Sequence, residues 1–191
     1  MSQLENHTII VYDLGSENMS IFRSENVKKL VRTTRVRSVQ LLHSLGLQCT
    51  ESVIIVAENR VSDIENVIVA VHYLYARLNN VLRNRGINVE LKPIIEVLNL
   101  TPQQTSRLIP LAERRLISSL DNAIETVSDI INILSSEVEE ERKKRIRNNL
   151  RRLAGNWRRI YQMANSLRIN ITKDYEFLVT LIEQALERCQ I

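Results

Sequence analysis

The segment from Asp121 to Arg168 constrains the fold most, because apolar residues recur along it at alternating steps of three and four. This spacing places them on one stripe of an α-helix, and such a helix packs against a partner helix. No glycine or proline interrupts the chain between Leu111 and Ala154. The stripe consists of Ile124, Val127, Ile131, Leu134 and Val138, and then of Leu150, Leu153, Trp157, Ile160, Ala164 and Leu167.

The charge of this segment reverses part-way along. Between Glu113 and Glu141 there are eight acidic residues and only two basic ones, Arg114 and Arg115. Between Arg142 and Arg168 there are ten basic residues and no aspartate or glutamate. The segment therefore has an acidic half followed by a basic half.

The junction between the halves decides whether they form one helix or two. Glu139, Glu140 and Glu141 each precede a cation by four residues. Such pairs stabilise an exposed helix by roughly 0.2–0.5 kcal/mol each, so we predict one long, coiled-coil-like helix. The apolar stripe slips in phase between Val138 and Leu150, which leaves a helical hairpin as the alternative. Its bend would lie near Asn148-Asn149 or Gly155.

The basic half carries two parallel rows of cations beside the apolar stripe. Within each row the residues are seven apart, which puts successive charges roughly 10 Å from one another on a helix. A row of this kind can follow a phosphate backbone without reading bases. The first row is Lys144, Arg151 and Arg158, and the second is Arg145, Arg152 and Arg159. We interpret Trp157, on the apolar stripe, as a packing anchor.

A second cationic patch is predicted on an earlier helix, from Ser24 to Leu45. Its apolar positions share one side, and Gly46 stands where a left-handed C-cap would end it. The candidate binding residues on its polar side are Lys28, Lys29, Arg32 and Arg35. The alternative is a solvated face that keeps the protein soluble.

The first hundred residues alternate between strand and helix patterns. The β-leaning runs His7–Leu14 and Asn18–Arg23 flank a short Gly-Ser-Glu connection and predict a hairpin. Ser52–Ala57 is apolar and β-branched, which predicts a central strand covered on both faces. Ser62 and Glu65 have capping-box spacing and open a helix that ends at Gly86. One or two strands follow, at 87–91 and 94–100, interrupted by Pro93.

This succession predicts an α+β protein with a domain boundary at residue 100. Residues 1–100 form a small α/β sheet domain, a hairpin plus β-α-β-α-β with partly parallel pairing. Residues 101–191 form an all-helical region with the long helix or helical hairpin. Thr101 and Gln104 have the spacing of a capping box, and Pro110 is expected to kink or restart the helix that follows. A last helix should run from Thr172 to Cys189, with Cys189 buried.

Residues Asp13, Gly15 and Ser16 follow a hydrophobic strand, and in this they resemble the first phosphate-binding hairpin of actin-like ATPases. The resemblance covers about a dozen residues. It implies two large domains and further glycine-rich phosphate loops. A chain of 191 residues with four glycines supplies neither, so we interpret the segment as a hairpin turn.

The sequence contains none of the short motifs that would specify catalysis, a metal site or a cofactor. The three histidines are scattered, and Cys49 and Cys189 lack metal-binding spacing. The four glycines are accounted for by turns and helix ends, so no phosphate-cradling loop remains. We expect a non-enzymatic protein without cofactor or metal. A small enzyme with a site in the N-terminal domain is one alternative.

The sequence predicts a polyanion-binding protein. A formal charge of +4 and a pI near 9.3 fit DNA, RNA, an acidic protein or an anionic membrane surface. We expect nucleic acid, bound with little sequence specificity, and a cytoplasmic homo-oligomer formed through the helical region. No transmembrane segment is predicted, and a membrane surface is the less favoured partner. The alternatives are a coiled-coil scaffold or adaptor, and neutralisation of the basic half by the acidic half.

Overall fold

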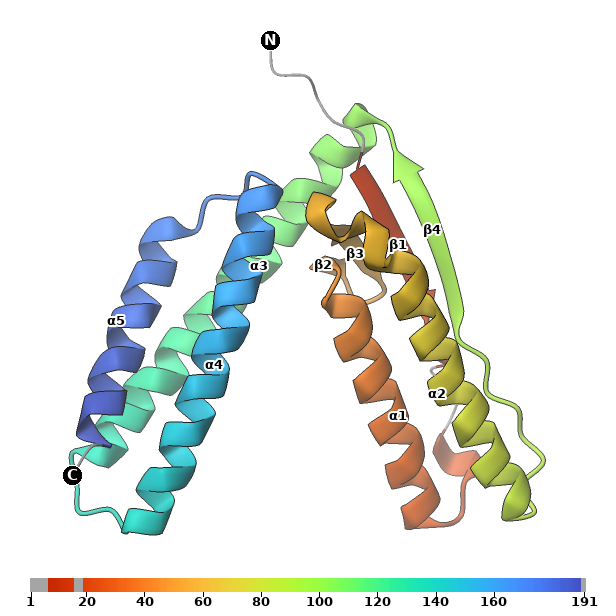
Figure 1. Cartoon of the computed structure of the whole chain (residues 1–191), viewed down its shortest axis with the longest axis horizontal. Coiled ribbons are helices and arrows are strands. Elements are labelled where there is room, and N and C mark those ends of the chain that lie inside the picture. The colour runs from red at the N-terminus through yellow and green to blue at the C-terminus, as the bar shows by residue number, and fades with distance from the viewer. Residues whose placement is uncertain (1–6, 16–18, 190–191) are drawn as a thin grey trace. The chain divides into compact units, whose positions relative to one another are not determined.

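The computed structural model describes residues 7–15 and 19–189 (Figure 1). The chain divides into two compact units, residues 1–109 and 110–191, and the division falls inside helix α3 (Pro102–Leu134). The first unit contains a four-stranded antiparallel sheet and the second is helical, which confirms the predicted α+β class. Among the helices described, none combines the length and apolar character needed to span a lipid bilayer.

The sheet has the order β2-β3-β1-β4, and every neighbouring pair is antiparallel. The strands are β1 (His7–Asp13), β2 (Gly46–Thr50), β3 (Val53–Val56) and β4 (Ile94–Leu100). The predicted parallel pairing is wrong, because Gly46–Thr50 forms an extra strand where the sequence indicated a helix C-cap. The β2–β3 hairpin reverses the chain, so β3 returns antiparallel to β1. The separate strand predicted at 87–91 is also wrong, since those residues form no strand.

The hairpin predicted at the N-terminus is wrong as well. Residues Met19–Ile21 form a 3-10 turn, η1, in place of a second strand, and 16–18 lie outside the described residues. The chain leaves β1 through a local turn, in which the Gly15 amide donates to the Asp13 carboxylate at 2.8 Å and Gly15 adopts a φ of 71°. Phe22, 2% exposed, then packs into the core. Burial of this ring explains why the segment turns inward.

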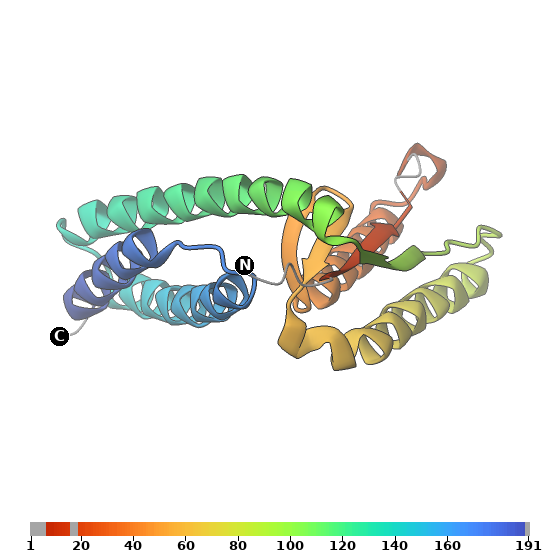
Figure 2. The ribbon, with the colours of Figure 1, turned by 90° about the horizontal axis from the view of Figure 1, so that it is seen from above.

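Helices α1 (Glu25–His43) and α2 (Ile64–Asn84) cover one face of the sheet (Figures 1 and 2). The core between them includes Ile10, Ile54, Val31 and Leu82. Ile55 points to the opposite face of β3 and is also fully buried. The predictions of an interior strand near Ser52–Ala57 and of a helix ending before Gly86 are therefore confirmed. The helix begins after a 3-10 turn, η2 (Glu58–Asp63), without the predicted side-chain cap.

Tyr75 in this core makes the stability of the first unit depend on pH in the alkaline range. Its hydroxyl donates to the Leu14 carbonyl at 2.7 Å, and burial raises the pKa of the phenol to about 12. A tyrosine in an unfolded chain has a pKa of about 10. Below about pH 10 the phenol is protonated in both the folded and the unfolded state, so it adds no pH dependence to the free energy of unfolding. Between about pH 10 and 12 only the unfolded state loses the proton, so stability falls as pH rises.

Substituting Tyr75→Phe is expected to remove this alkaline dependence. At neutral pH the variant should lose about 1–2 kcal/mol, because the Leu14 carbonyl loses its donor. Urea unfolding followed by circular dichroism across pH 9–12 would measure both effects. The two proteins differ only at residue 75, so the difference between the two curves isolates Tyr75. Parallel curves from pH 10 to 12 would contradict the assignment.

The second unit contains the remainder of α3, α4 (Glu140–Ser166) and α5 (Thr172–Arg188), which run antiparallel in succession (Figure 1). The single long helix predicted from Asp121 to Arg168 is wrong. The helical-hairpin alternative is correct in kind, but the bend lies at 135–139 and at neither of the predicted places. The Ser135 and Ser136 hydroxyls donate to the Ile131 and Ile133 carbonyls at 2.9 and 2.7 Å. Serine hydroxyls thus form hydrogen bonds with backbone carbonyl groups at the end of α3.

Two hydrogen bonds from Arg188 stabilise the end of α3 at the bend. The Arg188 guanidinium, next to the end of α5, donates to the Ile131 carbonyl at 3.2 Å and to the Ser135 hydroxyl. A cation near a helix C-terminus is favourable.

Of the three predicted pairs at the junction, Glu141–Arg145 forms at 2.9 Å, whereas Lys143 pairs with Glu140 at 3.2 Å. Both pairs lie in the first turns of α4, so they begin the second helix and do not bridge two halves.

About half of the apolar stripe predicted to meet a partner is buried within the chain, and the rest of it is half-buried. Val127, Leu150, Trp157 and Leu167 are at most 5% exposed. The predicted roles of Trp157 as a packing anchor and of Cys189 as a buried residue are confirmed. The capping box is confirmed too, since the Thr101 amide donates to Gln104 Oε1 at 2.9 Å and the Gln104 amide to Thr101 Oγ1 at 3.4 Å. Helix α3 is continuous through Pro110, so the prediction that the helix restarts there is wrong.

Candidate polyanion-binding surface

The six predicted cations of the basic half lie on one exposed face of α4. The buried residues Leu150, Trp157 and Ala164 define the opposite side of the helix, seven residues apart. Because a helix turns by 100° per residue, the six cations project away from this buried side. All six are exposed. We call Lys144, Arg145, Arg151, Arg152, Arg158 and Arg159 the α4 cationic face.

Most of this face is not neutralised by the described part of the chain. Arg145 pairs with Glu141 on the same helix, and both side chains are 76% exposed. Arg159 donates from Nε to the Gly155 carbonyl at 3.4 Å and from Nη2 to Asn156 Oδ1 at 3.3 Å. The other four cations, Lys144, Arg151, Arg152 and Arg158, form no ion pair with any residue that the structure describes.

The acidic half of the segment does not supply the missing partners. Glu125, Asp129 and Glu137 are exposed on α3 or in the bend, and none pairs with α4 within the described chain. The neutralisation expected as an alternative is therefore not seen among these residues. The side chains that α3 and α4 bury in the second unit are apolar, among them Val127, Leu134 and Trp157.

The rest of the outer side of α4 carries amides and no aromatic rings. Asn148, Asn149, Asn156 and Gln162 are exposed there. Trp157 is buried, and Tyr161 is half-buried and stacks on Tyr175 with ring centroids 4.2 Å apart. Amides donate and accept hydrogen bonds, whereas base stacking needs an exposed ring. The face is therefore suited to phosphates and polar groups more than to unpaired bases.

The α1 cluster, Lys28, Lys29, Arg32 and Arg35, belongs to the first compact unit and is considered by itself. Lys29 and Arg32 are exposed. Lys28 pairs with Glu25 at 2.6 Å, and this hydrogen bond, with the charges of Lys28 and Arg32, lowers the pKa of the Glu25 carboxyl. Arg35 is half-buried and close enough to Tyr75 for its charge to act on the phenol. Half of this cluster is thus already engaged within the fold.

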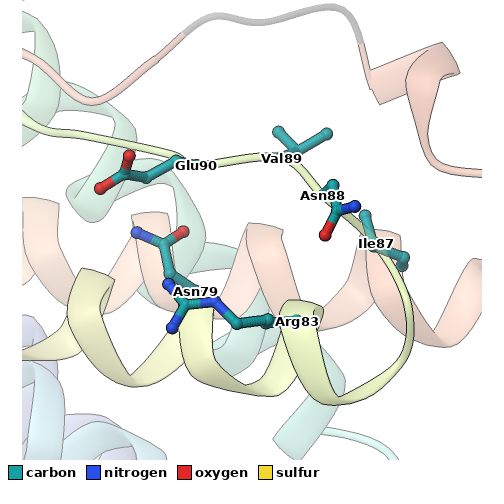
Figure 3. Close-up of a pocket in the computed structure, with 6 residues that line it drawn as sticks. All are labelled: Asn79, Arg83, Ile87, Asn88, Val89 and Glu90. Carbon is teal, nitrogen blue, oxygen red and sulfur yellow. The ribbon is translucent and has the colours of Figure 1, made fainter.

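A hollow of about 140 Å³ lies between the last turns of α2 and the segment that follows (Figure 3). Asn79 uses its amide to hold the backbone of Leu91, donating to its carbonyl at 2.8 Å and accepting from its amide at 3.0 Å. Pockets for small ligands typically measure about 300–1,000 Å³, so this hollow is too small for most metabolites. The lining residues are Asn79, Arg83, Ile87, Asn88, Val89 and Glu90.

The histidine, cysteine and carboxylate side chains of the described residues were the other candidates for a metal site or a nucleophile. Nowhere among them do three or more histidine, cysteine, aspartate or glutamate side chains gather as a metal site requires. The His43 ring lies 3.1 Å from the Tyr12 hydroxyl in a part-buried contact. Burial raises the pKa of the Cys49 thiol to about 11, which makes it a poor nucleophile at neutral pH.

The structure adds one feature of the cationic face that was not predicted from the sequence. Gly155, near one of the two places predicted for the hairpin bend, lies in the middle of the face and is exposed. Angular spacing on a helix gives its position as soon as α4 is known to be continuous.

No protein-family model, curated protein or solved structure matches this chain. The charge and exposure of α4 therefore carry the functional proposal.

Proposed function

We propose that this protein binds nucleic acid through the α4 cationic face, by contacts to phosphates and with little sequence specificity. The observation that carries the proposal is the exposure of four cations that have no carboxylate partner among the described residues: Lys144, Arg151, Arg152 and Arg158. A cluster of like charges without counter-charge on one face favours a polyanionic ligand.

The spacing and residue type support phosphate as the ligand. Successive cations of each row lie roughly 10 Å apart along the helix, and the two rows are adjacent. Five of the six residues are arginine. A guanidinium group binds a phosphate in a planar, bidentate manner that an ammonium group cannot reproduce. The absence of an exposed ring on the described part of α4 favours backbone contacts over base stacking.

A coiled-coil scaffold is less well supported. Leu150, Trp157 and Leu167 on the predicted stripe are buried within the chain, so they present no free apolar surface. A protein partner that binds the cationic face of α4 would be acidic. Homo-oligomer formation through the helical region stays a prediction.

Fluorescence anisotropy with a labelled DNA duplex across a salt series tests the proposal. Contact with four to six phosphates predicts that log K falls linearly with log salt, with a slope of about −4 to −5. Unlabelled polyglutamate of equal charge serves as competitor for the acidic-protein alternative. Failure of the protein to bind duplex at low salt contradicts the proposal, and displacement by polyglutamate as effective as by duplex favours an acidic protein.

A further inference from the structure

Gly155 lies at the centre of a ring of four arginines. On an α-helix, Arg151 and Arg159 lie about 40° to either side of it, one turn before and one turn after. Arg152 and Arg158 lie about 60° to either side. All four side chains and the glycine are exposed. The arginines thus surround a patch of helix surface on which the glycine leaves the backbone uncovered.

Nothing in the described fold requires glycine at this position. Glycine is the poorest helix former after proline. A Cβ added at Gly155 would meet no atom within 4 Å, and its φ is not positive. The fold does explain the other three glycines. Gly15, in the turn after β1, has a φ of 71°. A Cβ at Gly46 would stand 1.9 Å from the Ile55 carbonyl oxygen, and Gly86, which follows α2, has a φ of 73°.

We infer that Gly155 is the point where the phosphodiester backbone of double-stranded nucleic acid lies directly against α4. This rests on the proposed function and adds to it the ligand class and the point of contact. The missing Cβ lets a phosphate approach the helix backbone by about 1.5 Å more, the length of a carbon–carbon bond. The four arginines then reach the phosphate and its neighbours from both sides.

Two observations favour a duplex over a single strand. Proteins that bind single strands stack bases on aromatic rings, and none is exposed on the described part of α4. A duplex carries one phosphate charge per roughly 1.7 Å of its axis. At this charge density, both adjacent rows of cations can contact phosphates. The Arg159 Nε also donates to the Gly155 carbonyl oxygen at 3.4 Å. A guanidinium is therefore held beside the uncovered backbone before any ligand arrives.

The substitution Gly155→Ala in the full chain separates a binding role from a structural one. Alanine favours the helix, so Tm should rise by about 4 °C, while the affinity for a DNA duplex should fall tenfold or more. Asn122→Ala is the matched control, because Asn122 is exposed on α3 in the same unit and alanine also favours that helix. The control should raise Tm without changing the affinity.

Each other outcome decides against some part of the inference. Unchanged duplex affinity in Gly155→Ala, with wild-type protein that binds, overturns the role of Gly155 and leaves the proposed function intact. A lower Tm would show that the fold itself needs the glycine and would also overturn it. A single strand of the same length that binds as tightly as the duplex overturns the ligand class. Wild-type protein that binds neither probe at low salt overturns the proposed function as well.

Discussion

Duplex binding is expected to weaken on the order of a thousandfold at about 0.1 M salt when four arginines of the α4 cationic face become glutamine. Each phosphate contact adds about 0.9 to the slope of log K against log salt, so losing four should reduce its magnitude by about 3.6. Glutamine keeps length and polarity while removing the charge. The variant combines Arg151→Gln, Arg152→Gln, Arg158→Gln and Arg159→Gln.

A second variant separates the position of these charges from their number. It removes four exposed arginines of the first unit that belong to neither predicted cluster. The formal net charge falls from +4 by four, to 0, in both variants. The control should retain most of the affinity and salt dependence, as measured by anisotropy on the same duplex. Equal losses in the two variants would mean that total charge, and not α4, drives binding. The control combines Arg77→Gln, Arg83→Gln, Arg85→Gln and Arg107→Gln.

Gly46→Ala is expected to lower the free energy of unfolding by about 3 kcal/mol or more, at the upper end of overpacking substitutions. Gly46 begins β2 and pairs with Val56 in β3. An added Cβ would lie 1.9 Å from the Ile55 carbonyl oxygen and 2.8 Å from the Val56 Cα. Both are backbone atoms, so no side-chain rotation relieves the clash. The β2–β3 pairing itself would have to shift.

Urea unfolding monitored by far-ultraviolet circular dichroism measures this loss. Gly155→Ala is the control, because it adds the same methyl group at a position with free space and should change stability in the opposite direction. A Gly46→Ala protein within about 0.5 kcal/mol of wild type, the range of ordinary surface substitutions, would show that the strands accommodate the extra atom.

Local signals predicted the elements whose cause is local. The Thr101–Gln104 capping box, the apolar strand near Ser52–Ala57 and the amphipathic helix before Gly86 all formed as expected. Gly46 shows the limit of such signals. A glycine that supplies a positive φ and one that allows close backbone approach look the same in sequence. Only the neighbouring strand β3, which lies against it, distinguishes them.

The break between α3 and α4 was not predicted, because the ion pairs that favour a continuous helix contribute less free energy than the apolar burial that a hairpin allows. Ion pairs at the junction contribute roughly 0.2–0.5 kcal/mol each. Burying a single large apolar side chain contributes about 1.5–3 kcal/mol. A hairpin buries Val127, Leu150 and Trp157 within one chain, which a lone straight helix cannot do. The two serines at 135–136 were the available local sign of the bend.

The candidate surface was predictable in part. Helical spacing alone put the six cations of α4 opposite the apolar stripe, and they are exposed there. Whether Glu125 or Asp129 would reach them depended on how α3 is rotated about its own axis, which spacing within α4 does not determine. Among the described residues neither carboxylate pairs with α4.

The pairing of β1 with β4 has a consequence for the order of folding. His7 lies opposite Leu100, and Asp13 opposite Ile94. This strand pair therefore joins the beginning of the first unit to a segment near its end. During synthesis β1 therefore stays unpaired on one side until residue 100 has left the ribosome. The β2–β3 hairpin is local and can form much earlier. Contacts between residues so distant in sequence slow folding, because the long intervening loop must close before they form. The first unit should thus fold late and slowly, with closure of β4 onto β1 as the completing step.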